Sequence, residues 1–160
     1  MPITLYRIDD RLVHGQVVEA WLPHLKAGEI AVVSDDLSRD SVRQVIMRFA
    51  APEGVSLKIL TMAEAPGYLS EAEVRGPNVL VLLPGLSEAV ELIKGGVKIS
   101  KLNVGGMHYS AGKNLSIGRA IFLNDADCDA LRFLSDSGVL IEGRGVPSDS
   151  PLDLIEAITG

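Results

Sequence analysis

The sequence contains a single cysteine, Cys128, among 160 residues. One thiol cannot form an internal disulfide, and it has no second cysteine with which to build a zinc site. The composition therefore suits a reducing compartment, and the cytoplasm is the expected location. We expect neither a metal nor a cofactor.

Long apolar runs and basic residues are also scarce. No apolar run approaches the roughly 18 residues of a membrane span, and Met1–Thr4 lacks the basic and then apolar start of a signal peptide. The 15 Lys and Arg against 21 Asp and Glu give a formal charge of -6, which disfavours non-specific binding to nucleic acid. Any membrane association is expected to come through a partner.

The remaining composition, 47% hydrophobic and 22% charged, is that of a globular chain. We find no repeat and no linker, so residues 1–160 are expected to form one domain. Short β-branched runs alternate with segments of helical spacing, and runs such as Val79–Leu83 are apolar throughout, as strands covered on both faces require. This predicts an α/β fold with an open, mostly parallel, twisted sheet of six or seven strands and helices on both faces. The candidate strands are 3–8, 30–34, 56–60, 79–83, 101–104, 120–123 and 139–142.

Besides a helix through Val17, Val18 and Trp21, three further helices are predicted. Helical stripes of apolar residues occur in two segments and are interpreted as core: Val42, Val45, Ile46 and Phe49 in one, and Leu86, Ala89, Val90 and Ile93 in the other, which Gly95 and Gly96 end. A last helix is expected to begin at Pro151, with Ser150 as its cap, and to run to about Thr159.

The segment that follows the first strand, Arg7–Gln16, is the most polar of the chain. It combines an imidazole, His14, with guanidinium groups, carboxylates and a glycine, Gly15, just before a predicted helix that contains Trp21. Ligands of parallel sheets bind at the carboxyl ends of strands, and free helix amides attract anions. We therefore expect an anionic group beside His14.

Imidazole is a competent nucleophile toward phosphorus, because its reference pKa of about 6.5 leaves most of it unprotonated at physiological pH. Arg11 is the candidate for neutralising the phosphoryl oxygens, since a guanidinium presents a planar fork. Either Asp9 or Asp10 could hold the imidazole tautomer or orient Arg11. The competing interpretation is a solvated histidine beside a charge cluster that caps a helix.

The other two histidines are weaker candidates. His24 is expected to be exposed at the end of the first helix. His108 follows Gly105 and Gly106 at the end of another predicted strand, where the glycine amides could face a ligand. We interpret His108 as a pocket wall.

Three segments resemble one known family. Arg7–Val17 is similar to the signature of the IIB component of the mannose, fructose and sorbose family of the bacterial sugar phosphotransferase system. Asn103–Met107 resembles the second glycine segment of that family, and 138–147 resembles its C-terminal strand and turn. The resemblance covers essentially the whole chain.

The resemblance implies a cytoplasmic α/β domain whose histidine, here His14, accepts a phosphoryl group on Nδ1 from a IIA partner. The histidine then passes the group to a sugar held by the IIC and IID permease. By the same resemblance, Arg11 corresponds to the arginine that neighbours the histidine in the family, and a homodimer is plausible. Candidate binding residues are Arg7, Asp10, Gly15, Gln16, Gly105, Gly106 and His108. The segment 34–38 departs from the family pattern and leaves the sugar and partner open.

Alternatives from other classes lack their own signatures. A histidine phosphatase would have arginine where Val13 stands, a receiver domain would need an aspartate and a lysine at two other strand ends, and no glycine-rich nucleotide loop is present. A regulatory or orphan phosphohistidine protein remains as the second hypothesis. For transient docking, we expect an exposed loop around His14 and a basic rim that includes Arg7, Arg11 and either Lys113 or Arg119.

Overall fold

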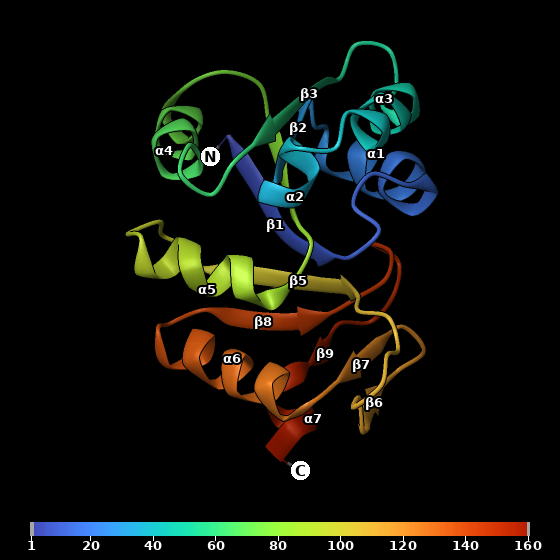
Figure 1. The fold of residues 1–160 in the computed structure, drawn as a ribbon, viewed down its shortest axis with the longest axis vertical. Helices are drawn as coiled ribbons and strands as arrows, with labels where there is room; N and C mark the ends of the chain where they lie inside the picture. Colours follow the sequence, from blue (N-terminus) through green and yellow to red (C-terminus); the bar gives the residue numbers. More distant parts are fainter. Residues whose placement is uncertain (1, 160) are drawn as a thin grey trace.

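A seven-stranded sheet organises the molecule. The computed structural model describes residues 2–159, and the strand order is β3-β2-β4-β1-β5-β8-β9, with every neighbouring pair parallel except β8 and β9. A separate antiparallel pair is formed by β6 and β7. Figure 1 shows both sheets. The strands are β1 (Ile3–Asp9), β2 (Glu29–Val33), β3 (Ser56–Leu60), β4 (Val79–Leu83), β5 (Lys101–Gly106), β6 (Leu115–Ile117), β7 (Ile121–Leu123), β8 (Leu140–Gly143) and β9 (Leu152–Asp153).

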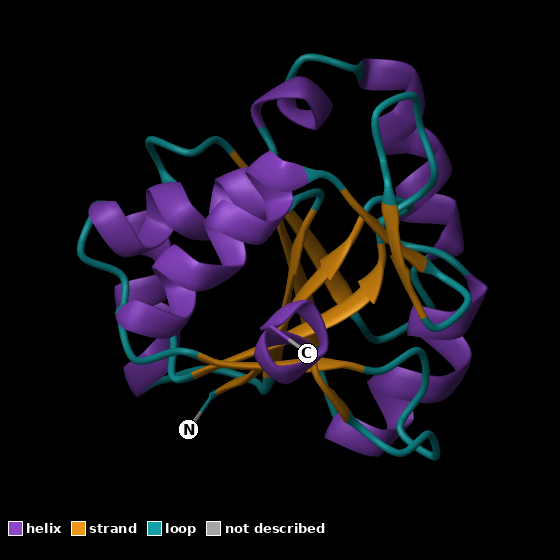
Figure 2. Cartoon of the chain, turned by 90° about the horizontal axis from the view of Figure 1, so that it is seen from below, coloured by secondary structure: helices purple, strands orange, loops and turns teal. Residues whose placement is uncertain are grey.

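Helices cover both faces of the large sheet (Figure 2). One face packs against η1 (Val17–Trp21, a π-helix), α1 (Leu22–Leu25), α2 (Asp35–Ser38) and α3 (Ser41–Ala50). The other face packs against α4 (Ala65–Val74), α5 (Leu86–Lys94), α6 (Asp125–Asp136) and α7 (Leu154–Thr159). The predicted α/β fold is confirmed.

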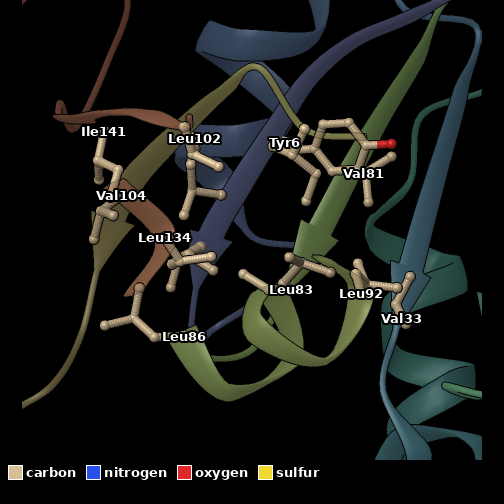
Figure 3. Packing of buried hydrophobic residues seen from close by; sticks show 14 of the residues in the cluster. Tyr6, Val33, Val81, Leu83, Leu86, Leu92, Leu102, Val104, Leu134 and Ile141 are labelled. Carbon is tan, nitrogen blue, oxygen red and sulfur yellow. The ribbon is translucent and has the colours of Figure 1, made fainter. Parts of the chain in front are cut away.

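The central strands alternate between the two cores, because successive side chains of a strand point to opposite faces. In β4, Leu80 and Leu82 enter the core under η1 and α3, whereas Val81 and Leu83 enter the core under α4, α5 and α6. Figure 3 shows the second core, where Leu83 lies among residues of several elements. The same alternation in β1 turns Tyr6 and Ile8 to one face and leaves Arg7 and Asp9 on the other.

The interpretation of the Val42, Val45, Ile46 and Phe49 stripe as core was wrong. These four side chains are exposed, and the helix packs instead through Met47. The α3 helix has apolar residues on both faces, so its periodicity could not say which face the sheet covers. The stripe of α5 was interpreted correctly: Leu86 and Ala89 are buried, and the helix ends at Lys94.

Two other predictions need correction. Residues 121–123 belong to the small antiparallel sheet and not to the large one. The last helix begins at Leu154, because residues 152–153 first pair with β8, and the Asp153 side chain accepts a hydrogen bond from the Glu156 amide in place of the expected Ser150 cap. Among residues 2–159, no helix has both the length and the apolar character needed to cross a bilayer.

Candidate functional site

The segment from β1 to η1 brings most of the predicted residues together at the carboxyl edge of the sheet, where the parallel strands end. The Leu12 amide bonds to the Asp9 carbonyl at 3.0 Å, and the Val18 amide bonds to the His14 carbonyl at 3.0 Å. Leu12 adopts a φ of 59°, in the left-handed region, which is energetically unfavourable for residues other than glycine. Its buried side chain holds the loop in this conformation.

The His14 ring is held by Asp9. Its Nε2 lies 2.7 Å from Oδ2 of Asp9, and the ring side chain is 14% exposed. The Asp9 carboxylate also accepts from the Arg7 guanidinium at 3.1 Å and from the Arg11 amide at 3.1 Å. A carboxylate with cationic donors around it acts as an acceptor, so Nε2 carries the proton and Nδ1 keeps a free lone pair. The question of which aspartate holds the imidazole is therefore answered in favour of Asp9.

Arg7 is fully buried beneath this pair, and the prediction that it forms part of a basic rim was wrong. Its guanidinium donates to the Asn103 side chain at 2.6 Å and to the carbonyls of Arg144 and Gly145 at 2.9 and 3.0 Å. The Trp21 ring lies 5.1 Å from it, in cation–π geometry. Burial lowers the pKa of Arg7, and the charge of Asp9 opposes that effect. Arg7 thus contacts Asp9 from the buried side and does not face solvent.

The two glycines of β5 have a different role from the one expected. A Cβ on Gly105 would overlap the Arg7 guanidinium, and a Cβ on Gly106 would lie 3.4 Å from Oδ1 of Asp9. Both glycines are buried, so they make room for Arg7 and Asp9 and do not present amides to a ligand. Close approach of a side chain, and not of a ligand, explains why glycine is needed here.

The outer part of the site is open. Arg11 is half exposed, and its guanidinium lies 3.8 Å from Asp9 and 3.4 Å from the Gln16 amide oxygen. Gly15 and Gln16 are exposed, and nothing lies within 4 Å of a Cβ built on Gly15. The expected exposed loop is found at these residues, whereas the His14 ring itself is mostly covered.

His108 is brought to the same edge by Asp10. The Asp10 carboxylate contacts Nδ1 of His108 at 2.5 Å and accepts from the His108 amide at 2.6 Å. Two recesses of about 460 and 420 Å³ share Asp10, Pro84 and Gly85 in their walls, and His108 lines the larger one. The interpretation of His108 as a pocket wall agrees with this placement. Another recess of about 490 Å³, beside Tyr6 and Gly96, contains none of the predicted site residues.

The rest of the expected basic rim is not assembled. Lys113 is largely buried and paired with Asp127, and the exposed Arg119 has no described contact with the His14 cluster. His24 is exposed, as expected. Four residues of the cluster were missed from the sequence because β5, β8 and the turn after β8, which carry them, are distant in the chain: Asn103, Glu142, Arg144 and Gly145. Trp21 of η1 is close in the chain, but its hydrogen bond to the Gly145 carbonyl depends on the same distant turn.

Comparison with known proteins gives consistent relatives. Residues 3–159 match the family described as "PTS system sorbose subfamily IIB component". A sorbose-specific EIIB component from Lacticaseibacillus casei is 35% identical over 158 residues, which cover 99% of the chain and 96% of that protein. A mannose-specific EIIAB component from Escherichia coli (strain K12) is 34% identical over 159 residues, which cover 99% of the chain but 49% of that relative.

Solved structures agree with this result. The crystal structure of the IIBSor domain of the sorbose permease from Klebsiella pneumoniae superimposes with a TM-score of 0.91 at 33% identity, covering 99% of the chain and 97% of that domain.

Proposed function

Because the chain belongs to the family of phosphotransferase-system IIB components of the sorbose subfamily, we propose that His14 accepts a phosphoryl group from phosphohistidine of a IIA protein and donates it to a sugar held by the IIC and IID permease components. The chain is a component of sugar phosphotransfer, and the IIB unit extends over residues 1–160. We place it in the cytoplasm, at the membrane through its permease partners, with homodimerisation as a further expectation from the family.

The observation that carries this proposal is the hydrogen bond between Nε2 of His14 and Asp9. It leaves the lone pair of Nδ1 to attack phosphorus. As the new N–P bond forms, the bond between phosphorus and the donor imidazole breaks, and its electron pair returns to the donor nitrogen. In the second transfer a sugar hydroxyl oxygen attacks phosphorus and releases its proton to water, while the bond between phosphorus and Nδ1 breaks and its electron pair returns to Nδ1.

The surrounding residues take separate roles in the proposed reaction. The guanidinium of Arg11 neutralises the equatorial oxygens of the transferring group, which is the main demand that phosphoryl transfer makes of a protein. Gly15 and Gln16 leave room for the partner that carries the group. Asp10 and His108 form the wall of the adjoining recess, while Gly105 and Gly106 act only by allowing Arg7 and Asp9 to be buried.

The test is phosphorylation with the general phosphotransferase proteins, a IIA protein and labelled phosphoenolpyruvate. We expect an acid-labile, alkali-stable phosphoprotein, with no label in His14→Ala and full label in the matched control His24→Ala. A chase with membranes containing IIC and IID should then remove the label when a suitable sugar is present. The relatives' names provide the panel: sorbose, mannose, fructose and N-acetylgalactosamine.

Each outcome has a defined meaning. Label retained in His14→Ala would refute the assignment of the acceptor. Label acquired on His14 but never lost to any sugar would instead favour the regulatory phosphoprotein.

A further inference from the structure

Three polar side chains cross the sheet in register beneath the His14 loop. Arg7 of β1 is paired with Asn103 of β5, and Asn103 is paired in turn with Glu142 of β8. All three are buried, on the face of the sheet where Arg7 meets Asp9. Buried polar groups must find hydrogen-bond partners within the protein, so each member of this row restricts the next.

The side-chain amide of Asn103 has only one orientation that its neighbours allow. Its Oδ1 accepts from Nη1 of Arg7 at 2.6 Å, and its Nδ2 donates to Oε2 of Glu142 at 2.9 Å. The other carboxylate oxygen of Glu142 lies 3.3 Å from Nζ of Lys101. A reversed amide would turn an NH2 group toward the guanidinium and an oxygen toward the carboxylate, and neither contact is a hydrogen bond. Glu142 therefore fixes Asn103 with its acceptor toward Arg7.

The donors of Arg7 are divided among several acceptors. Nη1 donates to Asn103 and to the Arg144 carbonyl at 2.9 Å. Nη2 donates to Oδ2 of Asp9 at 3.1 Å and to the Gly145 carbonyl at 3.0 Å. Nε is buried and has no acceptor among the residues that the structure describes. Arg7 thus reaches Asp9 through one hydrogen bond.

A single bond is not the usual contact between a guanidinium and a carboxylate. The two groups commonly form a fork of two parallel hydrogen bonds that engages both carboxylate oxygens. Such a fork would turn the plane of the Asp9 carboxylate toward Arg7. In the observed arrangement, Oδ1 accepts from the Arg11 amide at 3.1 Å, and Oδ2 lies 2.7 Å from Nε2 of His14. The carboxylate is therefore directed toward the loop.

We propose that Asn103, held by Glu142, is a positioning residue for phosphoryl transfer at His14. By occupying Nη1 of Arg7, it prevents the guanidinium from forming a two-bonded fork with Asp9. The inference rests on the proposed function, because its consequence is the free lone pair of Nδ1 that attacks phosphorus. A neutral amide suits this position, since a carboxylate in its place would compete with Asp9 for the guanidinium and would lie against Glu142.

The experiment is nitrogen-15 NMR of the His14 ring in the purified, unphosphorylated chain, at a pH where the ring is neutral. The signals are assigned with His24→Ala and His108→Ala. We expect the wild type to carry its proton on Nε2. Asn103→Leu has a similar size but no acceptor, and it should show a mixture of the two tautomers. Its uptake of phosphate from a IIA protein should be slower by roughly tenfold or more.

The control variants separate positioning from stability. Val104→Ala changes the next residue of β5, whose side chain lies in the core on the opposite face. It should lower the melting temperature but keep the wild-type tautomer and uptake. Glu142→Gln retains an acceptor for Asn103 and should also keep the tautomer, whereas Glu142→Ala removes that acceptor and should show a smaller part of the mixture. All spectra are recorded below the melting temperature of every variant.

The outcomes are decisive in either direction. A wild-type tautomer in Asn103→Leu overturns the proposal, and so does an equal mixture in Val104→Ala, because instability would then explain it. If Asn103→Leu does not fold, Glu142→Ala decides: some Nδ1–H tautomer supports the proposal, and a wild-type spectrum overturns it. The tautomer is measured without IIA or phosphate. A chain that shows the expected tautomers but is never labelled on His14 therefore refutes the proposed function alone.

Discussion

Two consecutive aspartates each hold a histidine, but in opposite surroundings. Asp9 has no exposed surface, and its carboxylate is fixed by Arg7, Arg11 and His14. Asp10 and His108 are 29% and 66% exposed. Solvent screens the contact between Asp10 and His108. The contact between Asp9 and His14 is surrounded by packed neighbours, whose rearrangement would cost free energy. The burial of Asp9, and not the mere presence of a carboxylate, therefore holds the ring of His14 in one orientation.

The largest difference is expected between Asp9→Asn and Asp10→Asn. Asp9→Asn removes the partner of a buried guanidinium, which costs about 3–5 kcal/mol of unfolding free energy. Misplacement of the imidazole proton should also slow phosphorylation by roughly 100-fold or more. Asp10→Asn should change the unfolding free energy by less than about 1 kcal/mol. Denaturant unfolding and single-turnover phosphorylation measure both quantities, and similar losses in the two variants would refute the distinction.

Arg11 should matter for transfer but not for folding. Arg11→Lys keeps the charge but loses the fork, and one such contact contributes about 2–4 kcal/mol to transition-state stabilisation, or roughly 30- to 1,000-fold in rate. The melting temperature should stay at the wild-type value, since this side chain is half exposed. Rapid-quench measurement of phosphoryl uptake checks this. A wild-type rate in the lysine variant would leave Arg11 as a surface charge.

The glycines Gly105 and Gly15 provide a matched pair. Gly105→Ala forces Arg7 to move, and overpacking of this kind costs about 1–3 kcal/mol. Because Trp21 is the sole tryptophan and lies against Arg7, its fluorescence should report the displacement. Gly15→Ala has open space and should unfold at the wild-type temperature or slightly above it. Any loss of phosphoryl uptake in this folded variant reports crowding of the docked partner.

His108 should give the smallest effect. Removing the exposed contact between Asp10 and His108 in His108→Ala is expected to cost less than about 1 kcal/mol, and any electrostatic part of that cost should fall at high salt. Uptake of phosphate on His14 should stay within about threefold of the wild type, because the buried pair is untouched. Melting curves at low and high ionic strength, together with the uptake assay, test this. A tenfold loss of uptake would place His108 in the transfer step.

Local patterns predicted the parts of the site that are close in the chain. The loop between β1 and η1 could be read as a unit, because its imidazole, guanidinium groups and glycine lie within ten residues. The choice between Asp9 and Asp10 could not be made from the sequence. It depends on strand alternation, which turns Arg7 and Asp9 to the same face of the sheet and buries both.

Other features depend on packing that no local pattern contains. Arg7 was predicted to be a surface charge, because the residues that bury it, in β5 and in the segment after β8, are distant in the chain. The stripe of α3 had the periodicity of a core helix, but the sheet covers the other side, where Met47 lies. The β9 strand is two residues long, too short for a periodicity to identify.

The hydrogen bonds from Arg7 to the carbonyls of Arg144 and Gly145 span 137 and 138 residues of sequence. On the ribosome, Arg7 is synthesised long before these acceptors, and the buried guanidinium cannot be satisfied until the C-terminal segment has docked. The N-terminal strand can therefore pair early, whereas two hydrogen bonds of Arg7, which contacts Asp9, form only after residues 144–145 have been made and have docked. A nascent chain that lacks its final twenty residues contains every residue of the loop and still has an unfinished site.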